Sequence, residues 1–505
     1  MGFLDNLALG FSVALSLNNV AYCLLGTVLG TAIGVLPGLG PVATISMLLP
    51  ITFGLDPTTA LILLAGIYYG AQYGGSTTAI LVNLPGETSS VVTAIDGYQM
   101  ARQGRAREAL VVAALGSFFA GTVGTLLIAA FAPALSTLAL DFGAPEYFSL
   151  MVLGLIAAVV LAHGSVLKAV AMVVFGLVLG LVGTDVNSGI LRFTFGMTDL
   201  FDGIDFVAVA MGLFGIAEVI SNLERADEKR EAVTLSGSGL GRFLLSRQDF
   251  RAAWPAVVRG TGLGAILGIL PGGGAILGSF ASYMVEKKIA RDPASFGKGA
   301  IQGVAGPEAA NNAGAQTSFI PMLTLGLPSN AVMALMIGAL IIHNIQPGPQ
   351  VMSSNPALFW GLIASMWVGN ALLVVLNLPL VGVWVRMLRI PYRMLYPGIL
   401  VLCAIGVYSV SNSTALVYIM AVFGVLGYAL AKMQCEPAPL LLGFVLGPMM
   451  EENFRRALSL SNGDLTVFVR QPISLGLLLV ALTLLVVMAL PRASRIRDNV
   501  FEESA

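Results

Sequence analysis

The sequence predicts an all-α polytopic membrane protein of about 10–12 transmembrane helices, in two inverted repeats with broken or re-entrant helices. Three observations lead to this prediction: the composition, a series of long apolar runs, and a glycine- and proline-containing pattern that occurs twice. Of the 505 residues, 57% are hydrophobic and only 10% are charged. Soluble domains carry about 25% charged residues, so most of this chain is expected to lie in lipid.

Apolar runs of roughly the length that spans a bilayer, about 20 residues, recur along the chain. They lie at 109–133, 147–162, 166–183, 204–220, 357–384, 397–410, 413–431 and 472–490. Further segments, interrupted by Gly or Pro, lie at 8–54, 57–83, 253–285 and 314–342. Residues 1–9 contain no Lys or Arg, so no secretory signal is expected. A polar stretch at 224–252 predicts a cytoplasmic linker between a first half, 1–223, and a second half, 253–505.

Two sequence patterns occur once in each half. The first runs from Gly26 to Gly40 and returns with the same internal spacing from Gly260 to Gly274. The second joins a Gly-Ala-Gln element to a Leu-Pro-Gly or Leu-Pro-Ser element, at 70–72 and 84–86 and again at 314–316 and 327–329. Because lipid cannot satisfy the backbone groups that a helix break frees, such breaks are expected to line a protected cavity. Matching breaks in two halves indicate the binding site of a secondary transporter.

The distribution of Lys and Arg predicts the orientation of the two halves. These residues concentrate in loops at 102–107, 225–251, 287–298, 386–393 and 492–497, which are expected to face the cytoplasm. The acidic loops at 141–146 and 185–205 are then outside, although Arg455 and Arg456 fit this scheme poorly. Basic residues precede the pattern in the second half and follow it in the first, which predicts inverted repeats. The net charge of −1 gives no reason to expect a nucleic-acid partner.

The helix breaks supply the first group of candidate binding residues. A helix that begins after a break presents unpaired N–H groups and the positive end of its dipole, which suit a carboxylate. A helix that ends before a break exposes carbonyl oxygens, which suit Na⁺. The alternative is a kink that packs small residues and binds nothing. The candidates are Pro37, Gly38 and Gly40 in the first half and Pro271, Gly272, Gly273 and Gly274 in the second.

Polar side chains near the breaks form the second group. Ser and Thr could instead bond to carbonyls of their own helix, and either glutamate could lie at an interface and cap a helix. Ionisable groups within the membrane are nevertheless expected to be functional. The first-half candidates are Gln72, Ser76, Thr77, Asn83, Pro85, Gly86 and Glu87. The second-half candidates are Glu308, Asn311, Asn312, Gln316, Thr317, Ser318, Pro328, Ser329 and Asn330.

Enzymatic motifs are missing from the sequence, so no catalytic residue is predicted. The glycine-rich stretch 268–279 lacks the Gly-Lys-Ser/Thr of a phosphate-binding loop. His163 and His343 have no partners at the spacing of a metal site, and the three cysteines are expected to be buried thiols. We therefore expect a protein that is not an enzyme, without a bound metal or cofactor other than a coupling ion.

Taken together, several motifs resemble the large membrane subunit of the tripartite tricarboxylate transporter family, the TctA-type protein. The resemblance extends from about residue 8 to residue 490 and rests on the segments 34–41, 69–76, 84–87, 96–98 and 306–312. It implies a multi-pass protein of the bacterial inner membrane and a symporter driven by an ion gradient, commonly Na⁺. It also implies a small transmembrane partner subunit and a periplasmic solute-binding protein that delivers the substrate, an organic acid such as citrate.

The residue types agree with import of a di- or tricarboxylate by symport with Na⁺ or H⁺. We find no Arg within the membrane segments to hold a carboxylate, so helix dipoles and bound cations would offset its charge. The helix ends at 37–41, 76–87, 271–275 and 317–330 are expected to surround the substrate, with spans at 109–220 and 357–490 as scaffold. A passive organic-anion channel is the alternative, because nothing in the sequence measures coupling. The choice between an elevator, which is slightly favoured, and a rocking movement stays open.

Overall fold

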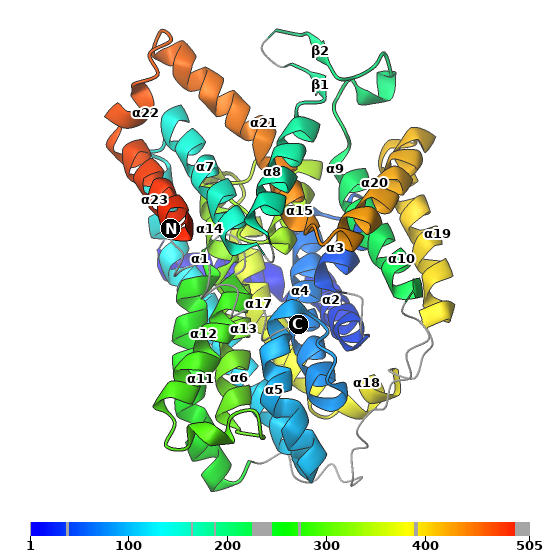
Figure 1. Cartoon of the computed structure of the whole chain (residues 1–505), viewed down its shortest axis with the longest axis vertical. Coiled ribbons are helices and arrows are strands. Elements are labelled where there is room, and N and C mark those ends of the chain that lie inside the picture. Colours follow the sequence, from blue (N-terminus) through cyan, green and yellow to red (C-terminus); the bar gives the residue numbers. More distant parts are fainter. Residues whose placement is uncertain are drawn as a thin grey trace.

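The computed structural model describes residues 2–36, 40–162, 165–185, 188–224, 245–270, 274–387 and 392–489. These residues are almost entirely helical (Figure 1), which confirms the all-α polytopic class. The one sheet among them pairs β1 (Gly183–Thr184) with β2 (Leu191–Arg192) in antiparallel fashion. Residues 225–244, most of the predicted linker, lie outside the described residues, and the next helix begins at Arg247, inside the predicted linker.

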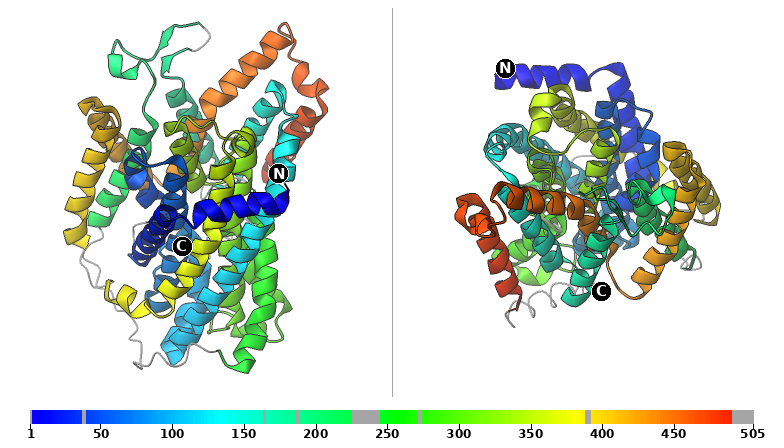
Figure 2. Two further views of the ribbon diagram at one scale, coloured as in Figure 1. Left: turned by 180° about the vertical axis from the view of Figure 1, so that it is seen from behind. Right: turned by 90° about the horizontal axis from the view of Figure 1, so that it is seen from above.

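The first half of the chain forms ten α-helices and four short 3-10 or π segments among the described residues. They are α1 (Phe3–Ala14), α2 (Leu17–Val35), α3 (Pro41–Thr52), α4 (Pro57–Val82), η1 (Thr88–Ser90), α5 (Val91–Met100), η2 (Ala101–Arg105), α6 (Ala106–Ala139), α7 (Ala144–Leu161), α8 (Val166–Gly180), η3 (Thr198–Leu200), α9 (Phe206–Ala210), η4 (Met211–Ile216) and α10 (Ala217–Glu224). Figure 2 shows α1 lying across the long axis of the molecule, where Phe3 contacts Trp360 edge to face.

The second half forms more α-helices than the first among the described residues. They are α11 (Arg247–Gly268), α12 (Gly274–Ile289), η5 (Pro293–Ser295), α13 (Gln302–Thr317), α14 (Phe319–Leu325), α15 (Ala331–Ile342), α16 (Gln350–Ser354), α17 (Pro356–Asn377), α18 (Val381–Met387), α19 (Tyr392–Ser411), α20 (Thr414–Lys432), α21 (Pro437–Leu460), α22 (Val467–Arg470) and α23 (Pro472–Ala489).

Most predicted spans correspond to observed helices, with four differences. The predicted broken segment 57–83 is one continuous helix, α4, because the glycines within it do not interrupt the helical backbone. Five helical segments of the described chain are long and apolar enough to cross a membrane, and seven shorter apolar helices accompany them. The predicted run 357–384 is divided, because α17 ends at Asn377. The helix α21 was not predicted as a span, because charged residues lie in its second half. The predicted broken segment 314–342 begins too late, since α13 already starts at Gln302.

The glycines of the first pattern form two tightly packed helix pairs. In the first half, Gly26, Gly30 and Gly34 of α2 lie directly against the backbone of α4. In the second half, Gly260 and Gly264 of α11 lie in the same way against the backbone of α13. A Cβ at any of these positions would overlap main-chain atoms of the facing helix. The four-residue spacing is that of small-residue packing between membrane helices, and it holds each pair together through the backbone.

The second pattern also takes the same local form in both halves. The helix α4 ends at Asn83, which has a left-handed backbone with φ of 56°. The helix α14 ends at Gly326, with φ of 70°. In each case Leu-Pro follows and a new helical segment begins a few residues later. The two halves therefore share their breaks, while their inverted relation stays a prediction.

The charged loops divide between the two ends of the long axis. The end of α5 and the start of α11 lie together at the bottom of Figure 1, where Arg105 pairs with Asp249 at 2.8 Å. The β1–β2 hairpin lies at the opposite end. Arg455, which fits the charge scheme poorly, pairs there with Asp185 at 3.2 Å and with Glu451 at 2.6 Å. Its charge is neutralised locally, so it does not conflict with an outer location of this end.

Candidate functional site

A cavity of about 580 Å³ lies between the two halves of the chain. Its wall includes residues at the end of both copies of the first pattern. These are Gly40, the last residue of the pattern, and Pro41 in the first half, and Ala275 and Ile276, which follow the pattern, in the second. It also includes the Pro85–Ser89 segment after α4 and the start of α15. The structure thus brings together around one space the four regions in which the sequence predicts helix ends.

Four long helices begin at this cavity. The first residues of α3, α12, α15 and α21 all contribute to its wall. Proline at the first position of α3 and α21 favours the start of a helix there. Asn330 caps α15, and its side-chain oxygen accepts a hydrogen bond from the Met333 N–H at 2.9 Å. Because helix N-termini carry partial positive charge, their convergence creates a favourable environment for an anion.

The ionisable side chains of the cavity wall are acidic. Glu87, Glu218 and Glu436 line it, and no Lys or Arg does so among the residues that the structure describes. Glu87 accepts a hydrogen bond from the Asn311 side chain at 2.8 Å. Since Glu87 places a carboxylate in this wall beside the helix N-termini, a cation beside it would favour the binding of an anionic ligand.

A second polar cluster surrounds Glu308, which is fully buried within α13. Ser76 of α4 donates to its carboxylate at 2.5 Å, and Thr93 of α5 donates at 2.8 Å. Asn312 and Ser117 contribute further bonds, at 3.0 Å and 3.4 Å. Glu308 lies in the interior of its helix, so it is not the interfacial helix cap considered as an alternative.

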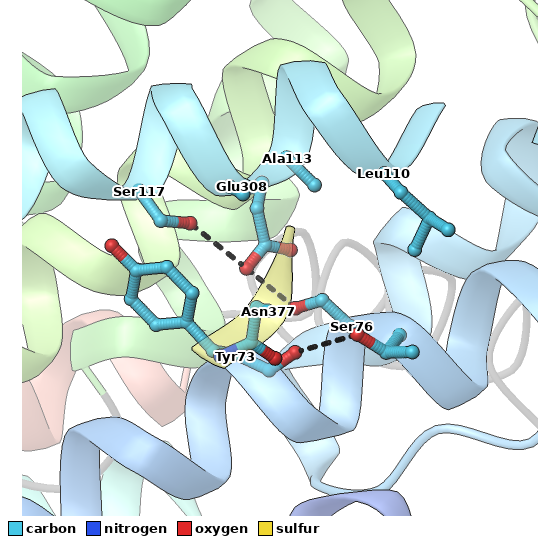
Figure 3. Close-up of a pocket in the computed structure, with 9 residues that line it drawn as sticks. Tyr73, Ser76, Leu110, Ala113, Ser117, Glu308 and Asn377 are labelled. Carbon is cyan, nitrogen blue, oxygen red and sulfur yellow. Dashed lines mark hydrogen bonds between the residues drawn. The ribbon is translucent and has the colours of Figure 1, made fainter. Parts of the chain in front are cut away.

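Glu308 also lines a small chamber of about 10 Å³, separate from the large cavity (Figure 3). Tyr73, Ser76, Thr77, Ser117 and Asn377 complete the polar part of its wall. The two sites are neighbours along the same helices. On α4, Gln72 lines the cavity while Ser76 lines the chamber, which is one helical turn, about 6 Å, away.

The predicted residues fall into three groups in the structure. Those that line one of the two spaces are Gly40, Gln72, Ser76, Thr77, Pro85, Gly86, Glu87, Glu308 and Asn330. Asn311 and Asn312 bond to Glu87 and Glu308 from α13 without lining either space. Pro37, Gly38, Pro271, Gly272 and Gly273 lie outside the described residues.

The remaining predicted residues support helices instead of lining the site. Asn83 is exposed at the end of α4, and Thr317 and Ser318 donate to carbonyls of α13. Ser76 and Thr77, which line the chamber, also donate to carbonyls of their own helix, those of Gln72 and Tyr73. Ser329 donates to the Ser318 carbonyl at 3.2 Å. Gly274 lies against the end of α11, and Pro328 and Gln316 line neither space, although Gln316 is buried.

Several residues of the site were not predicted from the sequence. Ser117 and Asn377 each lie among other scattered Ser, Thr or Asn residues of a long apolar run, and Thr93 lies in a short helix without a marked pattern. Glu218 and Glu436 carried a usable signal, because each is an isolated glutamate in or next to an apolar segment.

Comparisons with known proteins identify the family of the chain. A family model described as the tripartite tricarboxylate transporter TctA family matches residues 20–442. The chain belongs to this family. The family membership and the membrane-spanning helices make the chain a multi-pass membrane protein of a transporter family.

Two relatives of this TctA family protein come from Agrobacterium vitis. One, described as an uncharacterized 52.8 kDa protein in the TAR-I ttuC' 3' region, is 59% identical over 100% of this chain and 99% of its own length. The other, an uncharacterized protein in the TAR-II ttuC' 3' region, is 60% identical over 48% of this chain and 99% of its own length. No solved structure matches the chain.

Proposed function

We propose that this TctA family protein is the large membrane subunit of a secondary transporter that imports a di- or tricarboxylate together with a cation, Na⁺ in the first instance. The observation that carries the proposal is the cavity between the halves, where the N-termini of α3, α12, α15 and α21 converge. Helix N-termini at a protected cavity bind the carboxylates of substrates in other transporters.

Cation coupling follows from the charge of the site. A substrate with two or three carboxylates would enter a cavity that is lined by Glu87 and that adjoins the buried Glu308. Helix dipoles offset only part of this charge, because each contributes about half an elementary charge. Cations that enter with the substrate would supply the rest. Burial of the cluster inside the protein strengthens this electrostatic link between substrate and cation.

The family supports the remaining parts of the proposal. A tripartite system implies other subunits, and we propose that these are a small transmembrane subunit and a solute-binding protein in the periplasm of a bacterium. The chain would then reside in the inner membrane, and it would act without an enzymatic step or a cofactor. The dimensions of the cavity suit a small organic acid, with citrate and the common dicarboxylates as the first candidates.

The test is uptake into proteoliposomes that contain this subunit, its small partner and the binding protein. Labelled citrate and a panel of dicarboxylates would be offered with an inward Na⁺ gradient, with an inward proton gradient, and with neither. We expect one acid to accumulate above equilibrium only with a cation gradient, and accumulation to stop when an ionophore collapses that gradient. Equilibration that ignores both gradients would contradict symport and favour the passive anion channel.

A further inference from the structure

We propose that the chamber beside Glu308 is a binding site for one dehydrated Na⁺, distinct from the substrate cavity and contributed by both halves of the chain. This proposal rests on the function proposed above and names the place of its coupling ion. The chamber has room for about one water-sized particle, 10 Å³. Its oxygen-bearing side chains come from α4, α6, α13 and α17.

The first argument is an uncompensated charge. Glu308 is fully buried, and none of the ion pairs among the described residues includes it. Its hydrogen-bond partners Ser76, Thr93 and Asn312 are neutral donors. A buried carboxylate without a cation is strongly unfavourable, so either a proton or a metal ion must accompany it.

The second argument is an unpartnered oxygen in the chamber wall. Asn377 is 4% exposed, and its Nδ2 donates to the Leu373 carbonyl at 3.0 Å. This bond fixes the orientation of the amide, so that Oδ1 is the free atom, and Oδ1 has no hydrogen-bond partner. Figure 3 shows Asn377 close to Glu308, Ser76 and Ser117 around the same space. This free oxygen, together with the oxygens of Glu308, Ser76 and Ser117 around the same space, is available to an ion that needs several oxygen ligands.

The third argument is the helix dipole. Asn377 is the last residue of α17, so the negative end of this helix is at the chamber. A helix C-terminus favours a cation. The large cavity has the opposite character, because four helix N-termini meet there. The two neighbouring spaces are therefore suited to ligands of opposite charge.

The two sites are connected through adjacent residues of α13. Asn311 bonds to Glu87 in the cavity wall, while Asn312 bonds to Glu308 and, at 2.7 Å, to Ser117 in the chamber wall. A cation in the chamber would thus order the turn of α13 that also holds Glu87. This arrangement makes occupancy of one site favour occupancy of the other.

The experiment measures Na⁺ binding in the absence of substrate. The thermal unfolding temperature of the purified membrane complex is recorded as NaCl is increased, while choline chloride is reduced by the same amount to keep the ionic strength constant. The titration is repeated at pH 6 and pH 8. Wild type is expected to show a saturable rise. Asn377→Leu and Glu308→Gln should raise the half-saturating Na⁺ concentration at least tenfold. The control Ser149→Ala, which removes a buried hydroxyl bonded to Ser474 in another part of the fold, should leave it within twofold.

Asn377→Asp keeps the size of the side chain and an oxygen ligand, so it should retain Na⁺ binding. If it does, the loss in Asn377→Leu comes from the missing oxygen and not from a general failure to fold. The same variants are then assayed for uptake against Na⁺ concentration. If wild-type uptake depends on Na⁺ but the Asn377 and Glu308 variants keep wild-type half-saturation, the chamber is not the site and the proposed function stands. Wild-type uptake that follows the proton gradient and ignores Na⁺ would also overturn the Na⁺ site. A wild type without any gradient-driven uptake would overturn the proposed function as well.

Discussion

Neighbouring residues of one motif have different roles at the large cavity. Within Leu84-Pro85-Gly86-Glu87, Glu87 presents a carboxylate to the cavity while Gly86 permits a close backbone approach. A Cβ at Gly86 would overlap the Gly34 carbonyl at the end of α2. The sequence predicted both residues as part of the site. Only the structure shows that Glu87 can contact a ligand, whereas Gly86 allows the backbone to pack closely.

Gly86→Val is expected to abolish substrate uptake while the protein still inserts into the membrane. The added side chain would push the 84–89 segment away from α2 and change the cavity wall. The measurement is uptake per amount of protein in the membrane, with at least a hundredfold loss expected. Gly54→Val is the matched control, because nothing lies within 4 Å of the Cβ position at Gly54. Normal uptake by a well-expressed Gly86→Val protein would remove this close approach from the mechanism.

Residue types alone could identify part of the site. The cluster of polar residues that contains Glu308 and Asn312 stands out in an apolar chain, because a bilayer rarely tolerates such residues unless they have a function. Ser117 and Asn377 could not be found in this way, because a serine or asparagine in a long helix usually satisfies its own backbone. Their role depends on which helices come together, and this information is not local in the sequence.

At the level of elements, hydropathy identified the helices that are rich in large apolar side chains and failed for α13, which is not. The predicted runs 147–162, 413–431 and 472–490 correspond closely to α7, α20 and α23. The helix α13 is composed of Gly, Ala and polar residues and is buried along nearly its whole length by other helices. Since it is surrounded by protein, it needs no apolar surface, and the hydrophobic pattern that marks a membrane helix is missing.

The backbone packing of α11 on α13 leads to a prediction about stability. Gly264→Val would force a side chain into the main chain of α13 at Ala310. Overpacking of this kind typically costs about 1–3 kcal/mol, and we expect a clear fall in the thermal unfolding temperature of the purified protein. Gly262→Val, two residues away on the same helix with nothing within 4 Å of its Cβ position, is the control. Equal unfolding temperatures for the two variants would contradict the tight packing.

A loop between elements of the second half is held by a residue of the first. Asp96 of α5 is fully buried, and its Oδ1 accepts bonds from the backbone N–H groups of Gly297, Gly299 and Ala300 at 2.7–2.9 Å. Tyr283 donates to its other oxygen at 3.0 Å. The motif that contains Asp96 contributed to the family resemblance, and the structure gives it a role in joining the halves.

Asp96→Ala is expected to release this loop. Bonds to a charged acceptor contribute about 1.5–3 kcal/mol each, so the variant should be cleaved by trypsin at Lys298 at least tenfold faster than the wild type. Asp292→Ala, which removes an exposed cap of the same loop, should change the rate little. Equal cleavage of Asp96→Ala and wild type would show that the loop is held by other contacts.

At the level of the whole molecule, the charge distribution predicts which end faces the cytoplasm. The end with Arg105 and Lys298 would be inside, and the β1–β2 hairpin, where Phe195 is 86% exposed, would be outside. A cysteine at position 195 should react with a membrane-impermeant maleimide in intact cells. A cysteine in place of the exposed Lys298 should react only after the cells are permeabilised.

The native cysteines give little background in this experiment, because Cys23, Cys403 and Cys435 are all buried. The opposite labelling pattern would show that the whole orientation is inverted, while labelling of both positions in intact cells would contradict the separation of the two ends. The sequence predicted this separation from charge, except at Arg455, whose ion pairs with Asp185 and Glu451 depend on the fold.

The burial of α13 has a consequence for biosynthesis. This helix carries Glu308, Asn311, Asn312 and Gln316 and has no leucine, isoleucine or phenylalanine, so a translocon would not release it alone into lipid. Charged residues at the centre of a helix cost about 3 kcal/mol each on the insertion scale. The ribosome makes α2 to α11 first, and these helices must already form a partly closed bundle that offers α13 a polar partner. Insertion and tertiary folding of this chain are therefore one process, and a defect in the first half should appear as failed insertion of the second.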